Sequence, residues 1–118
     1  MASLQHEMTY RIRVRGPAKS DERLAADGFG RPGVRVAFVT DDDESILLRY
    51  QGLVQLTDAF TRAAGNDGTT RFEDQYMRMA TFFDTGAARY AWLNQSLFVA
   101  EGRLAGPKEV EYRIYRVT

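Results

Sequence analysis

Tyr76 and Arg78 are the two side chains of this sequence best placed to act together chemically. They lie two residues apart in segment 70–79, which is predicted to be a β-strand, so both would face the same side of a sheet. An arginine that points into a barrel beside a tyrosine ring holds an oxyanion or a phenolate, because its fork of donors stays charged. A buried ion pair closing the barrel floor is the equally open alternative. The candidate carboxylate partners of Arg78 are Asp42, Asp74, Asp84 and Glu101.

A second group of candidate side chains alternates along residues 89–95. If this segment is extended, Tyr90, Trp92 and Asn94 line one surface and make an aromatic stacking platform with an amide at its end. The alternative is a corner of the core in which Asn94 bonds to the main chain of a loop. The preceding string 84–86, Asp-Thr-Gly, is more typical of a turn than of a catalytic site.

Several other apparent motifs predict no site. The acidic run 41–44 lacks the spacing of a calcium loop and is expected to form a hairpin turn. Residues 28–33 match the spacing of a dinucleotide-binding loop, but they contain Pro32 and precede a strand, so no helix N-terminus is available for phosphate. His6 is the single histidine and lies in a terminus that is expected to be frayed, so Ser-His or Cys-His catalysis and a multi-histidine zinc site are not expected.

The composition predicts one domain spanning residues 1–118 and no nucleic-acid or membrane partner. Sixteen basic and sixteen acidic residues cancel, so no overall field attracts polyanions. The arginine stripe at 11, 13 and 15 is therefore expected to be a solvated strand face. No apolar run approaches the length of a transmembrane helix, and the chain has no cysteine. These features favour a cytoplasmic protein, and association into a homo-oligomer stays open.

Period-two alternation dominates the chain and predicts an all-β protein. We expect strands near residues 8–14, 34–40, 45–51, 70–79, 96–102 and 109–117, with a two-turn helix over 57–64. Residues 1–7 are expected to be a frayed terminus, and residues 16–33, rich in glycine and proline, a long loop. The predicted fold is a small antiparallel β-barrel, a meander of six to eight strands with at most one short helix.

Three motifs give the chain a family resemblance. The most specific runs from Phe83-x-Thr85-Gly86 through the string Arg-Tyr-Ala-Trp-Leu-Asn at 89–94 to Phe-Val at 98–99 and Gly102. The others are Tyr76-x-Arg78 and a segment that comprises Arg35, Thr40, Asp42, Ile46, Tyr50 and Gly52. Together they resemble the family catalogued as domain of unknown function 3237, also called uncharacterised protein family 0311, and the resemblance implies a β-barrel. Val36 and Asp43 depart from the family's usual Tyr and Gly, and its glycine-rich N-terminal segment has no clear counterpart here.

The combined prediction is a barrel that binds a small molecule. We expect a cofactor-free enzyme of isomerase, dehydratase, cyclase or lyase type that acts on an aromatic or polyketide-like compound in the lumen, without a metal. A non-catalytic carrier and an oligomer-forming structural domain are the alternatives, so whether the chain is an enzyme stays open. The candidate catalytic residues are Asp42, Tyr76 and Arg78, and the candidate ligand-binding residues are Arg35, Tyr50, Phe83, Tyr90, Trp92, Asn94 and Glu101.

Overall fold

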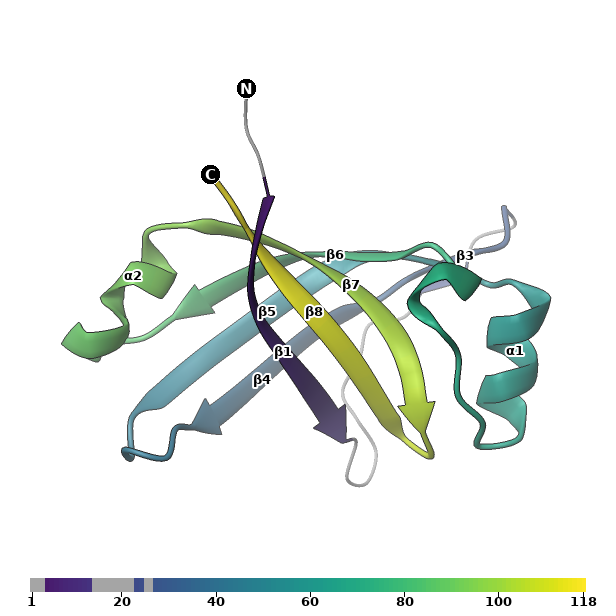
Figure 1. Cartoon of the computed structure of the whole chain (residues 1–118), viewed down its shortest axis with the longest axis horizontal. Helices are drawn as coiled ribbons and strands as arrows, with labels where there is room; N and C mark the ends of the chain where they lie inside the picture. Colours follow the sequence, from purple (N-terminus) through teal and green to yellow (C-terminus); the bar gives the residue numbers. More distant parts are fainter. Residues whose placement is uncertain (1–3, 14–22, 25–26) are drawn as a thin grey trace.

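The computed structural model describes residues 4–13, 23–24 and 27–118, which form a curved antiparallel sheet with two short α-helices (Figure 1). The strands lie in the order β1-β8-β7-β6-β5-β3-β2, and β4 also pairs with β5. The strands are β1 Leu4–Arg13, β2 Arg23–Leu24, β3 Phe29–Arg31, β4 Gly33–Val39, β5 Ser45–Gln55, β6 Met77–Asp84, β7 Leu97–Gly106 and β8 Glu109–Val117. The helices are α1 Asp58–Gly65 and α2 Ala91–Asn94, with 3-10 turns η1 Phe72–Asp74 and η2 Ala88–Tyr90.

Alternation along the strands separates an inner face from an outer face. In β5, Ile46, Leu48 and Tyr50 are buried while the residues between them are exposed. Residues paired directly across an antiparallel ladder share a face, so this parity passes from strand to strand. The inner face and α2 together bury a core made of Ile46, Leu48, Tyr50, Val54, Met77, Met79, Phe83, Leu93, Phe98, Ala100, Tyr112 and Ile114.

Strands β3 and β4 pair with successive parts of β5. Phe29 lies opposite Gln55 and Gly33 lies opposite Gln51, with Pro32 between the two strands. Proline has no backbone N–H to donate to a ladder, so it interrupts what would otherwise be one strand. Among the described residues no hydrogen-bonded pairing joins β1 to β4, and the sheet is barrel-like without being strictly closed. The predicted all-β antiparallel fold is confirmed.

Local signals for the helix and the turns behave as predicted. Thr57 caps α1, accepting a bond from the amide of Phe60 with an N–O distance of 3.2 Å. The acidic run 41–44 is a hairpin turn in which the amide of Asp43 donates to the carbonyl of Thr40 at 3.0 Å. Asp43 has a φ of 66°, the left-handed region where glycine is usual, and it is the position where the family pattern has Gly.

The strand predicted over 70–79 is shifted toward the C-terminus and overlaps the prediction only at residues 77–79. Asp74 accepts bonds from the amide and the guanidinium of Arg71, at 2.8 and 3.2 Å, and the chain makes the η1 turn at this point. Strand β6 therefore begins only at Met77 and continues to Asp84. Because η1 interrupts the segment, the alternation of faces along β6 does not extend back to residues 70–74. The prediction that Tyr76 and Arg78 face the same side of one strand therefore loses its basis.

The prediction that Tyr76 and Arg78 point into the barrel is wrong. Met77 and Met79 occupy the inner face of β6 and are buried. Arg78, between them, faces the outer side, and Tyr76 precedes the strand and is exposed. Two long apolar side chains gain more from burial than a guanidinium, whose desolvation is costly, so the methionines determine the orientation of β6.

Three further predictions from sequence differ from the structure. Residues 89–95 are helical rather than extended, so the chain has a second short helix, α2, beyond the one expected. Residues 4–7 are not frayed, because they belong to β1 and residues 4–6 pair with the end of β8, as in Leu4 with Val117, while residues 1–3 lie outside the described part of the chain. The predicted loop 16–33 contains β2 and β3, while its residues 16–22 and 25–26 lie outside the described part of the chain. None of the described helices is long and apolar enough to cross a membrane.

Candidate ligand-binding groove

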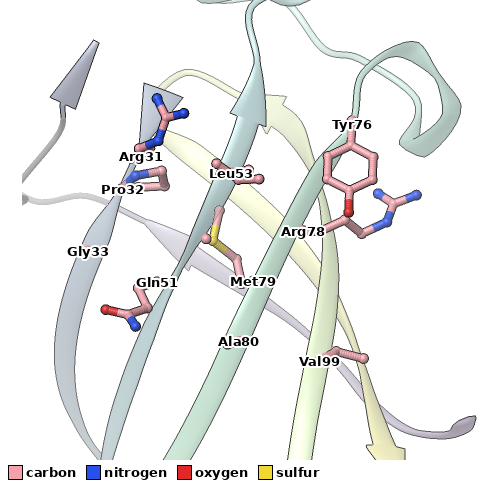
Figure 2. Close-up of a pocket in the computed structure, with 11 residues that line it drawn as sticks. Arg31, Pro32, Gly33, Gln51, Leu53, Tyr76, Arg78, Met79, Ala80 and Val99 are labelled. Atoms are coloured by element: carbon pink, nitrogen blue, oxygen red, sulfur yellow. The ribbon is translucent and has the colours of Figure 1, made fainter. Parts of the chain in front are cut away.

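The outer face of the sheet is hollowed into a groove of about 710 Å³ over β5 and β6. Leu53, Ala80 and Val99 form an apolar floor, since each is the outward-facing residue of its strand. Figure 2 shows Arg31 and Arg78 on opposite sides of this floor, with Leu53 between them. The lining consists of Arg31, Pro32, Gly33, Gln51, Gly52, Leu53, Tyr76, Arg78, Met79, Ala80 and Val99.

Arg78 forms one wall of the groove. Its side chain is 41% exposed and its guanidinium lies over the ring of Tyr76, with 5.0 Å from the guanidinium carbon to the ring centroid. One nitrogen donates to the carbonyl of Met77 at 3.0 Å. Another lies 3.8 Å from a carboxylate oxygen of Glu101, too far for a hydrogen bond. Part of the donor fork therefore remains available to a ligand.

Glu101 lies beside the groove and is held by other partners. Tyr115 donates its hydroxyl proton to Glu101 with an O–O distance of 3.0 Å, and Arg113 donates from 3.4 Å. Burial raises the pKa of the Tyr115 hydroxyl, and the Glu101 carboxylate raises it further. The predicted ligand-binding residue Glu101 thus pairs with the charged Arg113 and accepts a bond from Tyr115, both of β8.

Arg31 forms the opposite wall and was not predicted. Its guanidinium donates to Asp27 at 2.9 Å, and this bond is the largest of the causes that hold the pKa of Asp27 below its ordinary value. The pair is exposed, so it contributes little to stability. The sequence segment around Arg31 is too short and too rich in glycine to indicate a strand, so alternation could not have found it.

Other predicted site residues gather at the end of the sheet, where the β4–β5 turn meets the η2 turn. Asp42 accepts a bond from the Tyr90 hydroxyl at 2.9 Å and from the guanidinium of Arg89 at 2.8 Å. The hydroxyl of Thr40 also donates to Asp42. Asp42, proposed from sequence as a catalytic group or as a partner of Arg78, instead connects this turn to the helical segment.

The rest of that segment is fastened through Asn94. Its amide oxygen accepts from the amide N–H of Thr85 at 2.9 Å and its nitrogen donates to the Thr85 carbonyl at 2.7 Å. Thr85 in turn donates its hydroxyl to the carbonyl of Ser45 at 2.8 Å. The structural interpretation of Asn94, a side chain that bonds to loop main chain, is confirmed. Trp92 packs edge-on against Phe98 with centroids 6.3 Å apart and remains partly exposed.

Acidification is expected to loosen the η2–α2 segment. The pKa of Asp42 lies below its ordinary value, first because Thr40 donates to it and then because of Tyr90, with Arg89 adding a smaller effect. A carboxyl with a lowered folded-state pKa contributes stability above its unfolded pKa, about 3.9, and loses it as the pH falls through the folded value. Hydrogen exchange should therefore show the protection factors of amides 88–95 falling once the pH drops below about 4.

The matched variants for this test are Asp42→Asn and Asp41→Asn. The first should remove the acid-dependent loss of protection, because it cannot titrate. Asp41 makes no bond to the η2 segment among the described residues, so its variant should behave like the unmodified protein. An unchanged acid response in Asp42→Asn would contradict the role given to this carboxylate.

Two predicted site residues lie inside the sheet. Tyr50 is buried and its ring lies 5.1 Å from that of Tyr112. Burial raises the pKa of Tyr50, and a side-chain hydrogen bond with Tyr112 opposes this effect. Phe83 packs edge-on against Phe98 with centroids 5.1 Å apart. Both residues contribute to the core, on the face opposite to the groove.

Arg35 lies on β4 and is exposed, opposite Arg49 of β5. The predicted site residues are therefore distributed over four places, namely the core, the end of the sheet, the groove and the edge strand. The predicted cluster of Tyr76 and Arg78 with Tyr90 or Trp92 is wrong, because the first two lie at the groove while Tyr90 bonds to the β4–β5 turn.

A strongly curved antiparallel sheet with a filled inner face and a helical segment fastened across one end defines a small β-barrel-like protein. Comparison of the sequence with protein families identifies the family. The chain belongs to the family described as protein of unknown function (DUF3237), whose model matches residues 12–117. The family resemblance predicted from the three motifs is confirmed. No curated protein matches the chain.

Solved structures of similar fold come from several bacteria. RPA1785 of Rhodopseudomonas palustris, a conserved protein of unknown function, is 17% identical with a TM-score of 0.82, covering 100% of this chain and 98% of its own. A protein of unknown function from Clostridium acetobutylicum is 21% identical with a TM-score of 0.67, covering 84% and 63%. The β-barrel-like protein ABAYE2633 of Acinetobacter baumannii is 17% identical with a TM-score of 0.67, covering 98% and 77%. These likenesses concern the fold.

Proposed function

We propose that this protein binds a small organic anion with an apolar body in the outer groove, and that it does so without turning the ligand over. The observation that carries the proposal is an apolar floor with a guanidinium group on each side and, among the described residues, no acidic side chain in the lining. A volume of about 710 Å³ lies within the range of small-molecule sites, ~300–1,000 Å³.

The arrangement suits a flat carboxylate. Leu53, Ala80 and Val99 would contact the apolar body, while Arg78 would donate to a carboxylate at one end. The ring of Tyr76 holds the Arg78 guanidinium from one face, which reduces the conformational freedom that binding would otherwise remove. Glu101 competes weakly, because its oxygen lies 3.8 Å from the guanidinium.

The residues that line the groove favour ligand binding without catalysis over an enzymatic role. Proton transfer needs a positioned carboxylate, histidine or similar base beside the reacting atom. The lining residues offer two arginines, a tyrosine and an amide, with no carboxylate or histidine among them. The enzyme interpretation required a base and a cation in one cavity. Two carboxylates were candidates for the base. Asp42 lies at the end of the sheet, away from Arg78. Glu101 lies beside Arg78 but outside the lining, and it accepts bonds from Arg113 and Tyr115.

The test is calorimetric titration with naphthoate, using naphthamide as the uncharged analogue. Naphthoate should bind, and Arg78→Met should weaken its binding by roughly tenfold, because a lost charge-assisted bond of about 1.4 kcal/mol corresponds to tenfold. Methionine keeps much of the side-chain volume and removes the donor fork. The amide should bind more weakly than the acid and should respond little to the substitution.

Arg62→Met is the control, because Arg62 is an exposed arginine of α1 away from the groove. The Arg62→Met variant should bind naphthoate as tightly as the unmodified protein does. Both this variant and Arg78→Met should melt cooperatively. Equal naphthoate affinities in the Arg78 and Arg62 variants, or no naphthoate binding at all, would refute the proposed site.

A further inference from the structure

Within the described part of the chain, strand β4 has a free backbone edge. Among the described residues it pairs with β5 on one side and with no strand on the other. The amide of Thr40 donates to Glu44 at 2.8 Å. Likewise, the amide of Gly52 donates to Pro32 at 3.3 Å. Hydrogen-bonded pairs alternate along an antiparallel ladder, so these two pairs assign the bonds with β5 to even-numbered β4 residues. The groups that point away from β5 belong to Gly33, Arg35, Ala37 and Val39.

The outer face of this edge carries two arginines that lie opposite each other. Arg35 pairs in register with Arg49, and like charges directly opposite across a ladder destabilise it. Both are exposed, and among the described residues neither has an acidic partner. Arg49 lies over the ring of Phe82, 5.7 Å from its centroid. The pair is an uncompensated positive patch beside a free edge.

Apolar side chains lie beside this patch on the outer face. Val39 of β4 is 62% exposed, and Leu47 of β5, opposite Ala37, is also exposed. Exposed, apolar edge strands accept an additional strand, whose main chain supplies affinity and whose alternate side chains supply specificity. The charge of the patch then determines which strand is accepted.

We propose that β4 is a docking edge for an extended acidic segment of a partner protein. The segment would add a strand beside β4, bond to the outward groups of Gly33, Arg35, Ala37 and Val39, and place a carboxylate against Arg35 and Arg49. Apolar residues at alternate positions on one side of the acidic residue would lie over Leu47 and Val39.

A second copy of this chain is the less suitable occupant. Antiparallel pairing of two β4 strands about Val36 would align the whole strand with itself. It would also bring Arg35 and Arg49 of both copies onto one outer face, four guanidinium groups without a carboxylate on β4. Charged residues on edge strands commonly prevent self-association in this way, while admitting a partner of opposite charge.

The probe is a blocked, fluorescently labelled peptide of alternating threonine and valine with a central glutamate, and the matched probe has lysine in place of the glutamate. Anisotropy should show the glutamate peptide binding at least several-fold more tightly. Arg35→Gln should reduce its affinity roughly two- to fivefold, as expected for a cross-strand charge pair, and should reduce the preference between the two peptides. Arg62→Gln, on α1, is the control and should change neither value.

Ala37→Pro tests the role of the backbone. The Ala37 amide faces away from β5, so proline removes an outward donor without breaking a bond of the β4–β5 ladder. Peptide affinity should fall by at least about tenfold, the equivalent of one strong bond. In the unmodified protein, bound peptide should slow hydrogen exchange at Arg35, Ala37 and Val39 while leaving Val36 and Phe38 unchanged. This second measurement does not depend on the fold of the variant.

Several results would overturn the proposal. They are equal affinities for the two peptides, binding that Ala37→Pro does not affect, exchange that slows elsewhere than at the outward amides, and no binding of the glutamate peptide. A dimer seen by sedimentation without peptide and abolished by Ala37→Pro would instead identify a second copy of this chain as the occupant.

Discussion

Replacing Gly52 by alanine is expected to lower the free energy of unfolding by about 3 kcal/mol or more, because the added methyl group would meet main chain. A Cβ at this position would lie 1.9 Å from the carbonyl oxygen of Arg78 and 2.8 Å from the Cα of Met79. Neither atom is the end of a flexible side chain. Room could be made only by separating β5 from β6 beneath the groove.

Gly65→Ala is the matched control for this substitution. Gly65 ends α1, and a Cβ there would find nothing within 4 Å. Alanine is the better helix former, so this variant should be neutral or more stable by up to ~1 kcal/mol. Urea unfolding of the two variants, compared at equal m-values, measures the difference. Similar stabilities for the two variants would show that β5 and β6 leave room for a methyl group at Gly52.

The steric requirement at Gly52 explains part of what sequence alone predicted well. Gly52 belongs to the motif that indicated the family, and its presence follows from the approach of two main chains. Asp43 is a second example, because the family pattern marked a position of positive φ and the structure has φ of 66° there. In both cases the local backbone geometry restricts which residue type fits, so the residue type in the motif predicts that geometry.

The orientation of Arg78 was not predictable by the same means. Alternation assigns faces only if the segment is one continuous strand. The bonds between Arg71 and Asp74 stabilise the η1 turn before the strand. The residue types alone do not predict that these two residues bond to each other. The buried methionines on either side of Arg78 were the better guide, because apolar burial outweighs a single charged side chain in determining a face.

The Tyr-x-Trp-x-Asn string shows why a specific motif need not be a binding site. The hydroxyl of Tyr90 donates to Asp42, and the side-chain amide of Asn94 bonds to the main chain of Thr85. These bonds fasten a short helical segment that has too few residues to be stable on its own. A motif that tethers such a segment is as specific in sequence as one that binds a ligand, so specificity alone could not distinguish the two.

The groove and the β4 edge adjoin, because Gly33 lines the groove and also begins β4. The two proposals nevertheless rest on different atoms, the side chain of Arg78 and the outward main chain of β4. Their decisive variants, Arg78→Met and Ala37→Pro, share no residue. Loss of naphthoate binding with retained peptide binding, or the reverse, would therefore separate the two sites.

Leu48→Ala is expected to cost about 2–5 kcal/mol of the free energy of unfolding, whereas Leu47→Ala should cost less than about 1 kcal/mol. The two leucines are neighbours on β5, and the same atoms are removed in each case. Leu48 is 2% exposed on the inner face and Leu47 is 38% exposed on the outer face. Removal of the inner side chain leaves a cavity that the surrounding sheet cannot fill, while removal of the outer one leaves space that water fills.

Thermal and urea unfolding of both variants would measure this difference. The contrast tests the register of β5, because a slip of one residue would exchange the two faces and reverse the order of the two costs. It also tests the placement of the groove, whose floor residue Leu53 has the same parity as Leu47. Equal costs would mean that the outer face of β5 is covered in solution, and the groove would then not be open to a small ligand.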